Sequence, residues 1–332
     1  MWSNIFKIVF RNIARHKLFS FINIAGLSLG LTVFILVFLY VKFQFSYDTF
    51  HKNYENIYRI EVYKDNGNNS RLTRWTPYYL SDELVQKYPE VISRTRFGYF
   101  GDKVISNSKR TVQFNIDDGF YTDEETFSIF TYTIIEGNKE NILTEPFTIA
   151  LSESVAKKLF PDQLAVGQTV ITEGKEEYKV TAVFEDIPKN SHFDYTFFVS
   201  MPTLEQKQKG KDFNNPNEEY YCSFVLLNPH TNLENLNSSI KDLINDKLTK
   251  ETVKTKMYLK PLPDIHFYAG EVGKGRDSSI GLLIVYIALG VFTLLLALLN
   301  YMNLTTAFSA SRTKEIGIRK VNGANVLEIL GT

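Results

Sequence analysis

The sequence predicts an α+β extracytoplasmic domain held between two transmembrane α-helices. Two uncharged stretches carry this prediction, since residues 18–41 and 278–311 of the 332-residue chain contain no Asp, Glu, Lys or Arg. A bilayer is crossed by about 20 apolar helical residues, so both stretches are long enough. Residues 42–277 between them alternate strand-like and helix-like runs. The overall balance of 37 basic and 37 acidic residues hides this uneven distribution and argues against a nucleic-acid partner.

The first transmembrane helix is expected at residues 18–41. Its apolar run is longer than the about 7–15 residues of a signal peptide, and Lys42 and aromatic residues follow it instead of a small-residue cleavage site. We therefore expect an uncleaved helix. Residues 1–17 place apolar side chains on one side of a helical wheel and basic ones on the other, which predicts an amphipathic cytoplasmic helix at the membrane interface. A simple basic tail is the alternative.

The second transmembrane helix is expected at residues 278–308, where an apolar run extends from Ile280 to Leu304. Basic residues precede the first helix and follow the second, within residues 309–332. Because positive charge stays on the cytoplasmic side, both termini are expected in the cytoplasm and residues 42–277 outside. That outer segment has 29 basic and 35 acidic residues, a net charge of −6.

Small and amide side chains mark the expected helix contacts within the membrane. Gly26 and Gly30 form a GxxxG pattern, which lets helix backbones approach closely. Asn23, Asn300 and Asn303 lie toward the cytoplasmic ends, where their amides are expected either to bond between helices or to reach solvent. Neither apolar run contains an acidic or basic side chain, so no proton or ion pathway is expected.

The segment between the helices is expected to form an α+β domain of two lobes. The polar stretch at residues 205–217 is either a loop or the boundary between these lobes. Strands are predicted at Ile57–Tyr63, Thr111–Ile116, Thr148–Leu151, Tyr178–Glu185, Tyr195–Ser200, Tyr221–Leu227 and Lys256–Leu262. Helices are predicted at Ser81–Tyr88, Ser152–Phe160 and Leu233–Leu248, with Ser152 as the N-cap of the second.

Residue patterns that carry enzyme chemistry are missing from the sequence. The five histidines have no paired metal-binding spacing, and no P-loop pattern GxxxxGK[ST] occurs. Cys222 stands alone in an apolar run, so we expect a buried thiol and no disulfide. We therefore expect no catalytic residue, no metal and no cofactor, and hence no enzyme. An acidic patch is interpreted as a solvated helix start: Asp117, Asp118, Asp123, Glu124 and Glu125.

One segment carries a specific resemblance. Residues 294–324, LLLALLNYMNLTTAFSASRTKEIGIRKVNGA, resemble the signature of MacB/FtsX-type ABC transporter permeases. Further segments agree with this family in the expected order. They are FRNIARHKLFSFINIAGLSLGLT (10–32), YDTFHKNYENIYRIE (47–61), LSESVAKKLFPDQLAVGQTV (151–170), TAVFEDIPKNSHFDYTFFVS (181–200) and DIHFY (264–268).

The resemblance implies a permease subunit of the inner membrane, with residues 42–277 as a periplasmic MacB-like core domain. It implies a separate cytoplasmic ABC ATPase, a homo- or heterodimer of permease chains, lipid around the helices and an envelope adaptor or other envelope protein as partners. The activity would be export, as in efflux, or mechanotransmission. Residues 309–332 would begin the FtsX-like permease domain. The implied ATPase contacts are Arg312, Lys314, Glu315, Ile316, Gly317, Ile318, Arg319, Lys320, Gly323 and Ala324.

One departure from the family leaves alternatives open. Such permeases have two more membrane helices after this segment, whereas the sequence stops at Thr332. We therefore expect either a part of a longer permease or a half that needs a partner chain. A two-span envelope sensor is the alternative function, although residues 312–324 lack the heptad repeat of a signalling relay. A scaffold would need long coiled-coil helices outside the membrane.

Overall fold

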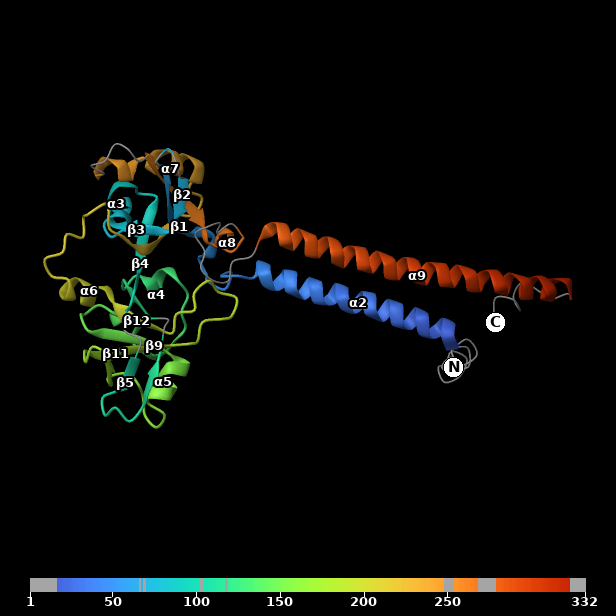
Figure 1. Cartoon of the computed structure of the whole chain (residues 1–332), viewed down its shortest axis with the longest axis horizontal. Coiled ribbons are helices and arrows are strands. Elements are labelled where there is room, and N and C mark those ends of the chain that lie inside the picture. The colour runs from blue at the N-terminus through green and yellow to red at the C-terminus, as the bar shows by residue number, and fades with distance from the viewer. Residues whose placement is uncertain are drawn as a thin grey trace. The chain divides into compact units, whose positions relative to one another are not determined.

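The chain folds into two units, a pair of long helices and an α+β domain (Figure 1). The helix pair consists of residues 1–44 and 280–332, and the domain consists of residues 45–279. Together they confirm the predicted fold class. The computed structural model describes residues 17–65, 67, 70–101, 104–116, 119–247, 254–267 and 279–322. The amphipathic helix expected at residues 1–17 therefore lies, except for Lys17, outside the described residues.

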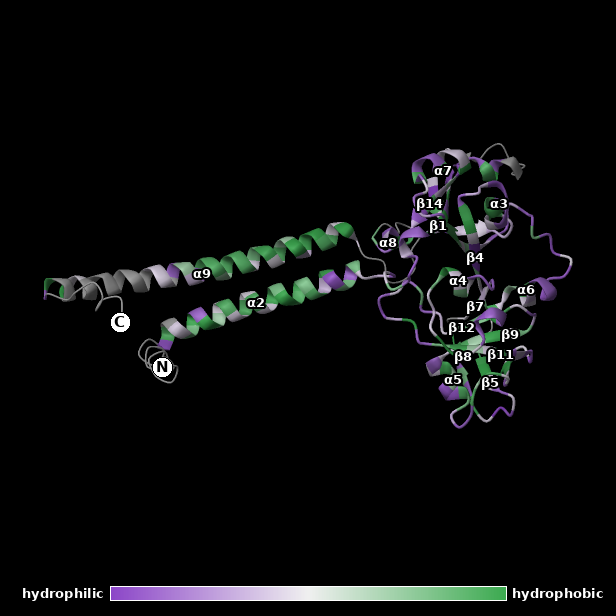
Figure 2. Ribbon diagram, turned by 180° about the vertical axis from the view of Figure 1, so that it is seen from behind, coloured by the Kyte–Doolittle hydropathy of each residue, from purple (hydrophilic) through white to green (hydrophobic). Residues whose placement is uncertain are grey.

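Helices α2 (Lys17–Phe45) and α9 (Ile280–Val321) form the first unit. Their segments Ser20–Phe45 and Ile280–Asn303 are each long and apolar enough to cross a membrane. Figure 2 shows mainly apolar residues along α2 and along the first part of α9. Large apolar side chains such as Leu29, which is 68% exposed, are left uncovered by the described residues. Lipid is the environment in which such a surface is stable.

The domain is built on one continuous sheet of fourteen strands in the described part of the chain. The order is β14-β1-β13-β4-β7-β12-β9-β11-β10-β5-β6, with β2 on β1, β3 on β13 and β8 on β11. Only the β7–β12 and β9–β11 pairs are parallel. The first seven strands are β1 (Ile57–Asp65), β2 (Ser70–Thr73), β3 (Trp75–Pro77), β4 (Val91–Tyr99), β5 (Val104–Asn107), β6 (Gln113–Asn115) and β7 (Gly119–Thr122). The others are β8 (Ile134–Gly137), β9 (Thr148–Ser152), β10 (Thr169–Thr172), β11 (Glu177–Phe184), β12 (Phe197–Ser200), β13 (Glu219–Leu227) and β14 (Lys254–Pro261).

Short helices cover the sheet and complete the domain. The α-helices are α3 (Leu80–Lys87), α4 (Thr126–Ile129), α5 (Glu153–Leu159), α6 (Met201–Lys207), α7 (Leu233–Ile240) and α8 (Leu262–Ile265). The 3-10 helices are η1 (Tyr54–Asn56), η2 (Lys139–Asn141) and η3 (Leu243–Lys247). We call β1–β4, β13, β14, α3 and α7 the first lobe, and β5–β12, α5 and α6 the second lobe; they occupy opposite ends of the domain in Figure 1.

Three hydrophobic clusters stabilise this arrangement. One lies in the first lobe and contains Ile60, Leu84 and Met257. Another is centred in the second lobe around Leu151 and also includes Tyr221 of β13. The third is rich in phenylalanine and contains side chains of both lobes, among them Phe97. The lobes therefore share one core, and they meet where β4 pairs with β7.

The seven predicted strands and the first two predicted helices are confirmed, with ends shifted by a few residues. The helix predicted at Leu233–Leu248 is too long, because α7 ends at Ile240. The carbonyl oxygen of Lys241 accepts a hydrogen bond from the Met257 N–H of β14 at 2.8 Å, which joins the chain after α7 to the sheet. A separate 3-10 helix, η3, follows instead.

The predicted cap of α5 is wrong in its detail. Ser152 occupies the N-cap position, but its side chain makes no capping hydrogen bond. The Asp186 carboxylate accepts from the Ser154 N–H at 3.1 Å instead. A carboxylate at this end is also favoured by the positive pole of the helix dipole. A residue distant in sequence has thus replaced the local cap.

The close packing of β7 against β12 can be tested by substitution. A Cβ atom at Gly119 would lie 2.0 Å from Cζ of Phe197. Gly119→Ala should therefore destabilise the domain by about 1–3 kcal/mol through overpacking. Gly101→Ala is the matched control, because no atom lies within 4 Å of its added methyl group. Thermal unfolding of the full chain in nanodiscs measures both, and equal melting temperatures would contradict this packing.

Candidate functional site

Glycines allow α2 and α9 to pack closely. A Cβ atom at Gly30 would lie 2.5 Å from Cβ of Ala297 and 3.2 Å from the carbonyl oxygen of Thr293. A Cβ atom at Gly290 would lie 3.0 Å from Cγ1 of Val37. Larger residues at either glycine would therefore push the helices apart. The structure thus places the GxxxG face of α2 against α9.

The three asparagines of the expected contact differ in position. Asn300 approaches α2 so closely that a Cβ atom at Gly26 would lie 2.6 Å from its Nδ2. The buried Oδ1 atom of Asn23 accepts no hydrogen bond from any described residue. Asn303 is exposed. The structure therefore brings Asn300 and Gly26 together, without joining Asn23 to either.

The segment expected to contact an ATPase is the end of α9. The helix continues without a break through Arg312 to Val321 and is followed by a turn at Asn322. Gly317 and Ile318 are exposed, the latter by 57%. Gly323 and Ala324 lie outside the described residues, as do the side chains of Arg312, Lys314, Glu315, Ile316, Arg319 and Lys320.

A buried aspartate anchors the start of the domain. Asp48, which is 1% exposed, follows α2 in the turn at residues 46–50 and has a φ of 56°. Its Oδ1 accepts hydrogen bonds from the Ser191 hydroxyl at 2.8 Å and from the His192 N–H at 3.1 Å. Its Oδ2 lies 2.6 Å from Nδ1 of His192. This carboxylate therefore fixes the first turn of the domain to a loop more than 140 residues away.

The end of the domain packs against the same turn. The ring of Tyr47 stacks on His266, directly after α8, with centroids 3.6 Å apart. The rings of His192 and His266 are 5.3 Å apart, and those of Phe45 and Phe267 are 5.1 Å apart. The segment directly after α8 is thus joined by ring contacts to the turn at which the domain begins. We call Tyr47, Asp48, His51, His192 and His266 the entry–exit cluster.

His51 is the neutral member of the entry–exit cluster. Its Nδ1 accepts a hydrogen bond from the Thr131 N–H at 3.0 Å, so the proton of the neutral ring belongs on Nε2. That Nε2 atom is buried with no acceptor among the described residues. Burial lowers the pKa of His51 to about 4, although Asp48 acts in the opposite direction.

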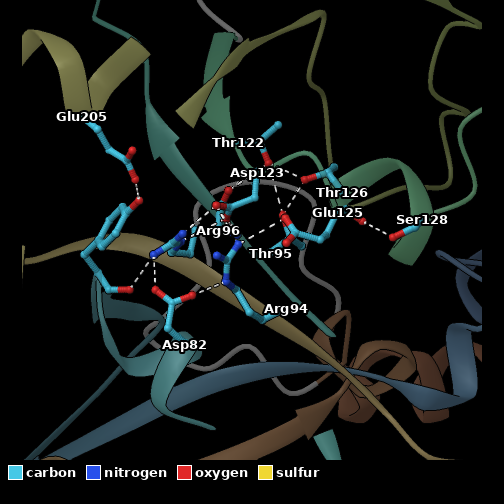
Figure 3. Close-up of polar contacts among 11 residues, drawn as sticks. Asp82, Arg94, Thr95, Arg96, Thr122, Asp123, Glu125, Thr126, Ser128 and Glu205 are labelled. Carbon is cyan, nitrogen blue, oxygen red and sulfur yellow. Dashed lines mark hydrogen bonds and ion pairs between the residues drawn. The ribbon is translucent and has the colours of Figure 1, made fainter. Parts of the chain in front are cut away.

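A second group of buried charges lies where the lobes meet (Figure 3). Arg96 of β4 donates from its backbone N–H, Nε and Nη2 to the carboxylate of Asp123, at 2.7, 3.0 and 2.6 Å. Its Nη1 donates to Oδ2 of Asp82 at 2.9 Å and to the carbonyl of Tyr78 at 3.0 Å. The guanidinium also lies over the Tyr78 ring at 3.6 Å. Every branch of this buried side chain is therefore engaged.

Arg94 extends this network on the same face of β4. Its Nη1 lies 2.7 Å from Oδ1 of Asp123 and 3.3 Å from Oε2 of Glu125, and its Nε pairs with Asp82. We call Asp82, Arg94, Arg96, Asp123 and Glu125 the ion cluster. Burial most strongly opposes the charge of Arg96, yet Asp123 and Asp82 raise its pKa above the ordinary value.

The ion cluster corrects the prediction of a solvated acidic patch. Asp123 is 5% exposed and belongs to the network, while Glu124 is exposed. Helix α4 does begin at Thr126, as a helix start there predicts. Asp117 and Asp118 lie outside the described residues. The sequence does not reveal the burial of Asp123, because its partners, Arg94 and Arg96, are distant in sequence.

Other chemistry-bearing residues do not assemble into a metal site. Among the described residues, no group of three or more His, Cys, Asp and Glu side chains is placed to hold a metal ion. Cys222 is buried as a free thiol, as predicted, and burial raises its pKa. The histidines of the entry–exit cluster looked scattered in sequence. The sequence feature that could have identified them is that His51, His192 and His266 all lie in segments that carry the family resemblance.

The ion cluster predicts a large loss of stability on truncation. Arg96→Met leaves Asp123 and Asp82 short of a buried partner and should cost about 3 kcal/mol. Lys157→Met is the control, because Lys157 pairs with Glu153 on the exposed face of α5 and its loss should leave the melting temperature unchanged. Thermal unfolding of the full chain in nanodiscs measures both. Equal melting temperatures would show that the ion cluster does not stabilise the domain.

His51 predicts acid sensitivity. Its pKa is about 4 when folded and 6.5 in the unfolded chain, so the unfolded state binds the proton more tightly. The stabilisation is complete above pH 6.5 and is lost as the pH falls toward 4, by roughly 3 kcal/mol in total. His51→Gln should flatten the melting temperature between these pH values. An unchanged pH dependence in that variant would contradict a buried neutral ring.

Comparisons with known proteins identify the domain. The family described as MacB-like periplasmic core domain matches residues 20–243. A search of curated sequences finds no match. Among solved structures, a domain of a protein assigned as a permease from Porphyromonas gingivalis superposes with a TM-score of 0.55 at 18% identity, covering 64% of this chain and 91% of that chain. This likeness supports the fold.

Two further solved structures are more distant. The periplasmic region of MacB from Actinobacillus actinomycetemcomitans has a TM-score of 0.45 at 16% identity, covering 66% of this chain and 94% of that chain. The extracellular domain of the noncanonic ABC-type transporter YknZ from Gram-positive bacteria has a TM-score of 0.42 at 14% identity, covering 59% of this chain and 98% of that chain. The family match spans more than half of the sequence. The chain belongs to the MacB-like periplasmic core domain family.

Proposed function

We propose that this chain is a permease subunit of an ABC transporter that couples ATP hydrolysis by a separate cytoplasmic ATPase to motion of its α+β domain. One observation carries the proposal: two helices of membrane-spanning length and composition frame a MacB-like periplasmic core domain in one chain. The basic residues outside both spans support cytoplasmic termini and a periplasmic domain in the inner membrane. Export and mechanotransmission are the two uses of such motion.

The entry–exit cluster supports a mechanical coupling. Helix α2 runs directly into the turn that Asp48 fixes to Ser191 and His192. The stacked rings of Tyr47 and His266 hold the last described turn of the domain to the same place. A pull through α2 would therefore act on this turn and on the segments that it contacts. A domain joined in this way follows its helices instead of unravelling from one end.

The length of α9 supports a lever. The helix has 42 residues, and at about 1.5 Å per residue it is about 63 Å long. Its apolar segment ends at Asn303, so the remaining turns to Val321 extend about 27 Å farther. We assign this polar extension, with Arg312–Ala324 at its end, as the contact surface for the ATPase. The exposed Ile318 offers that partner an apolar side chain.

The uncovered helix surfaces support further membrane partners. Phe21 of α2 and Met302 of α9 are 69% and 59% exposed in the chain taken by itself. Lipid covers such side chains, and so does a second permease chain in a homo- or heterodimer. An envelope adaptor would bind the domain and not the helices. The transported or displaced substrate is a separate question from this coupling.

A charge exchange tests the ATPase contact. Glu315→Lys combined with Arg319→Glu retains an i, i+4 ion pair on α9 but inverts its order, so the helix persists while the surface presented to the partner is reversed. ATP hydrolysis by the complex purified from native membranes should fall about tenfold, a coupling loss of about 1.4 kcal/mol. Membrane insertion should be unchanged.

Glu153→Lys with Lys157→Glu is the matched control. This pair has the same spacing on α5, in the α+β domain, and should leave ATP hydrolysis unchanged. Co-purification of the ATPase provides the second readout. Normal hydrolysis and normal ATPase recovery in the α9 variant would contradict the assigned contact surface.

A further inference from the structure

An aromatic cavity of about 600 Å³ lies between the two lobes. Trp75, Tyr99, Tyr220 and Tyr221 form its wall, from strands β3, β4 and β13. Leu204 of α6 in the second lobe completes the apolar lining. A cavity of this size is large enough for a small organic ligand. The permease function proposed above makes no use of it.

The aromatic rings are arranged for contact with a ligand. Tyr99 and Tyr220 are 54% and 59% exposed, although tyrosines on paired central strands are usually well covered. Tyr221 packs in the space that Gly98 leaves, since a Cβ atom there would lie 3.1 Å from the Tyr221 ring. The sheet therefore presents two exposed rings beside a closely packed one, and Lys211 Nζ lies over one face of the Tyr220 ring, 5.3 Å from its centroid. Aromatic ring faces attract the polarised C–H groups of a ligand.

The charged groups at the cavity already have partners. Lys211 lies 2.6 Å from Glu218, and Glu219 lies 2.6 Å from Lys64. The cavity therefore offers neither an uncompensated cation nor an uncompensated anion among the described lining residues. A charged ligand would have to break one of these pairs. The lining consequently favours a ligand without net charge.

Hydrogen-bonding capacity remains at the cavity. Gln208, which follows α6 and lines the cavity, has a carboxamide oxygen that accepts no hydrogen bond from any described residue. A buried acceptor without a donor costs free energy, so reorientation toward a hydroxyl-bearing ligand is favourable. Tyr99 and Tyr220, which also line the cavity, are more than half exposed. The cavity thus combines exposed aromatic rings, hydrogen-bonding groups and charge balance.

We propose that this cavity binds a neutral saccharide. A sugar ring has an apolar C–H face for stacking on Tyr99 or Tyr220 and a rim of hydroxyl groups for the Gln208 carboxamide. A neutral sugar carries no charge, so it can bind without breaking the ion pairs of the cavity lining. Open access through the exposed tyrosines suits a unit of a longer glycan as well as a free oligosaccharide. The domain would then recognise a glycan of the envelope.

Trp75 provides a built-in probe for the test. The chain has two tryptophans, Trp2 and Trp75, so Trp2→Phe leaves Trp75 as the sole indole. The full chain in nanodiscs is titrated with triacetylchitotriose and with maltotriose while indole fluorescence is recorded. We expect a saturable change with at least one of them. Tyr220→Ala and Gln208→Ala should each weaken that binding about tenfold.

Tyr258→Ala is the matched control. Tyr258 is a partly exposed tyrosine of β14, outside the cavity lining, and its loss should leave the titration unchanged. No saturable change with either sugar up to about 10 mM, weaker than most specific binding, would overturn the proposal. So would equal affinity in Tyr220→Ala and the parent. ATP hydrolysis by the complex does not enter this readout, so its outcome is independent of the permease assignment.

Discussion

The buried pairing of Arg96 with Asp123 is the interaction on which the rest of the domain depends. It lies where β4 meets β7, the only ladder through which the main strand order passes from the first lobe to the second. Arg96 reaches Asp82 of α3 as well, so one guanidinium fixes a helix and two strands of different lobes. The desolvation of these charges is offset only when all partners are in place, which favours a single arrangement of the lobes. The phenylalanine-rich core beneath them makes the same joint apolar.

A joint of this kind keeps the two lobes in one arrangement, which the proposed coupling to α2 and α9 requires. The entry–exit cluster ties the first turn of the domain to the loop at His192 and to the segment after α8, and the ion cluster ties the two lobes to each other. Glycine contacts hold α2 and α9 together along the apolar segment. Each of these three contact sets joins parts of the chain that are far apart in sequence. Their combination explains how a displacement at α9 could be passed through the domain without unfolding it, as the permease proposal requires.

Patterns among neighbouring residues predicted much of this structure. Contacts between residues far apart in the sequence could not be predicted. The two apolar helices and seven strands follow from charge-free length and from alternation, which are properties of neighbouring residues. Strand β4 was not predicted, because it carries Arg94 and the buried Arg96, whose acidic partners come from elsewhere in the chain. The entry–exit cluster was not predicted for the same reason, since Asp48 and His192 are 144 residues apart. The cavity is formed by three strands and a helix, so no single segment could show it.

In this permease, we expect the two lobes of the domain to move as one body. Spin labels at Leu164 in the second lobe, which is 71% exposed, and at Tyr258 in the first, which is 38% exposed, test it in a Cys222→Ser background. Double electron–electron resonance on the full chain in nanodiscs then measures the distance between the lobes. The account predicts one narrow distribution that ATP addition to the native complex leaves unchanged and that Arg96→Met broadens. A broad or nucleotide-dependent distribution in the parent chain would contradict it.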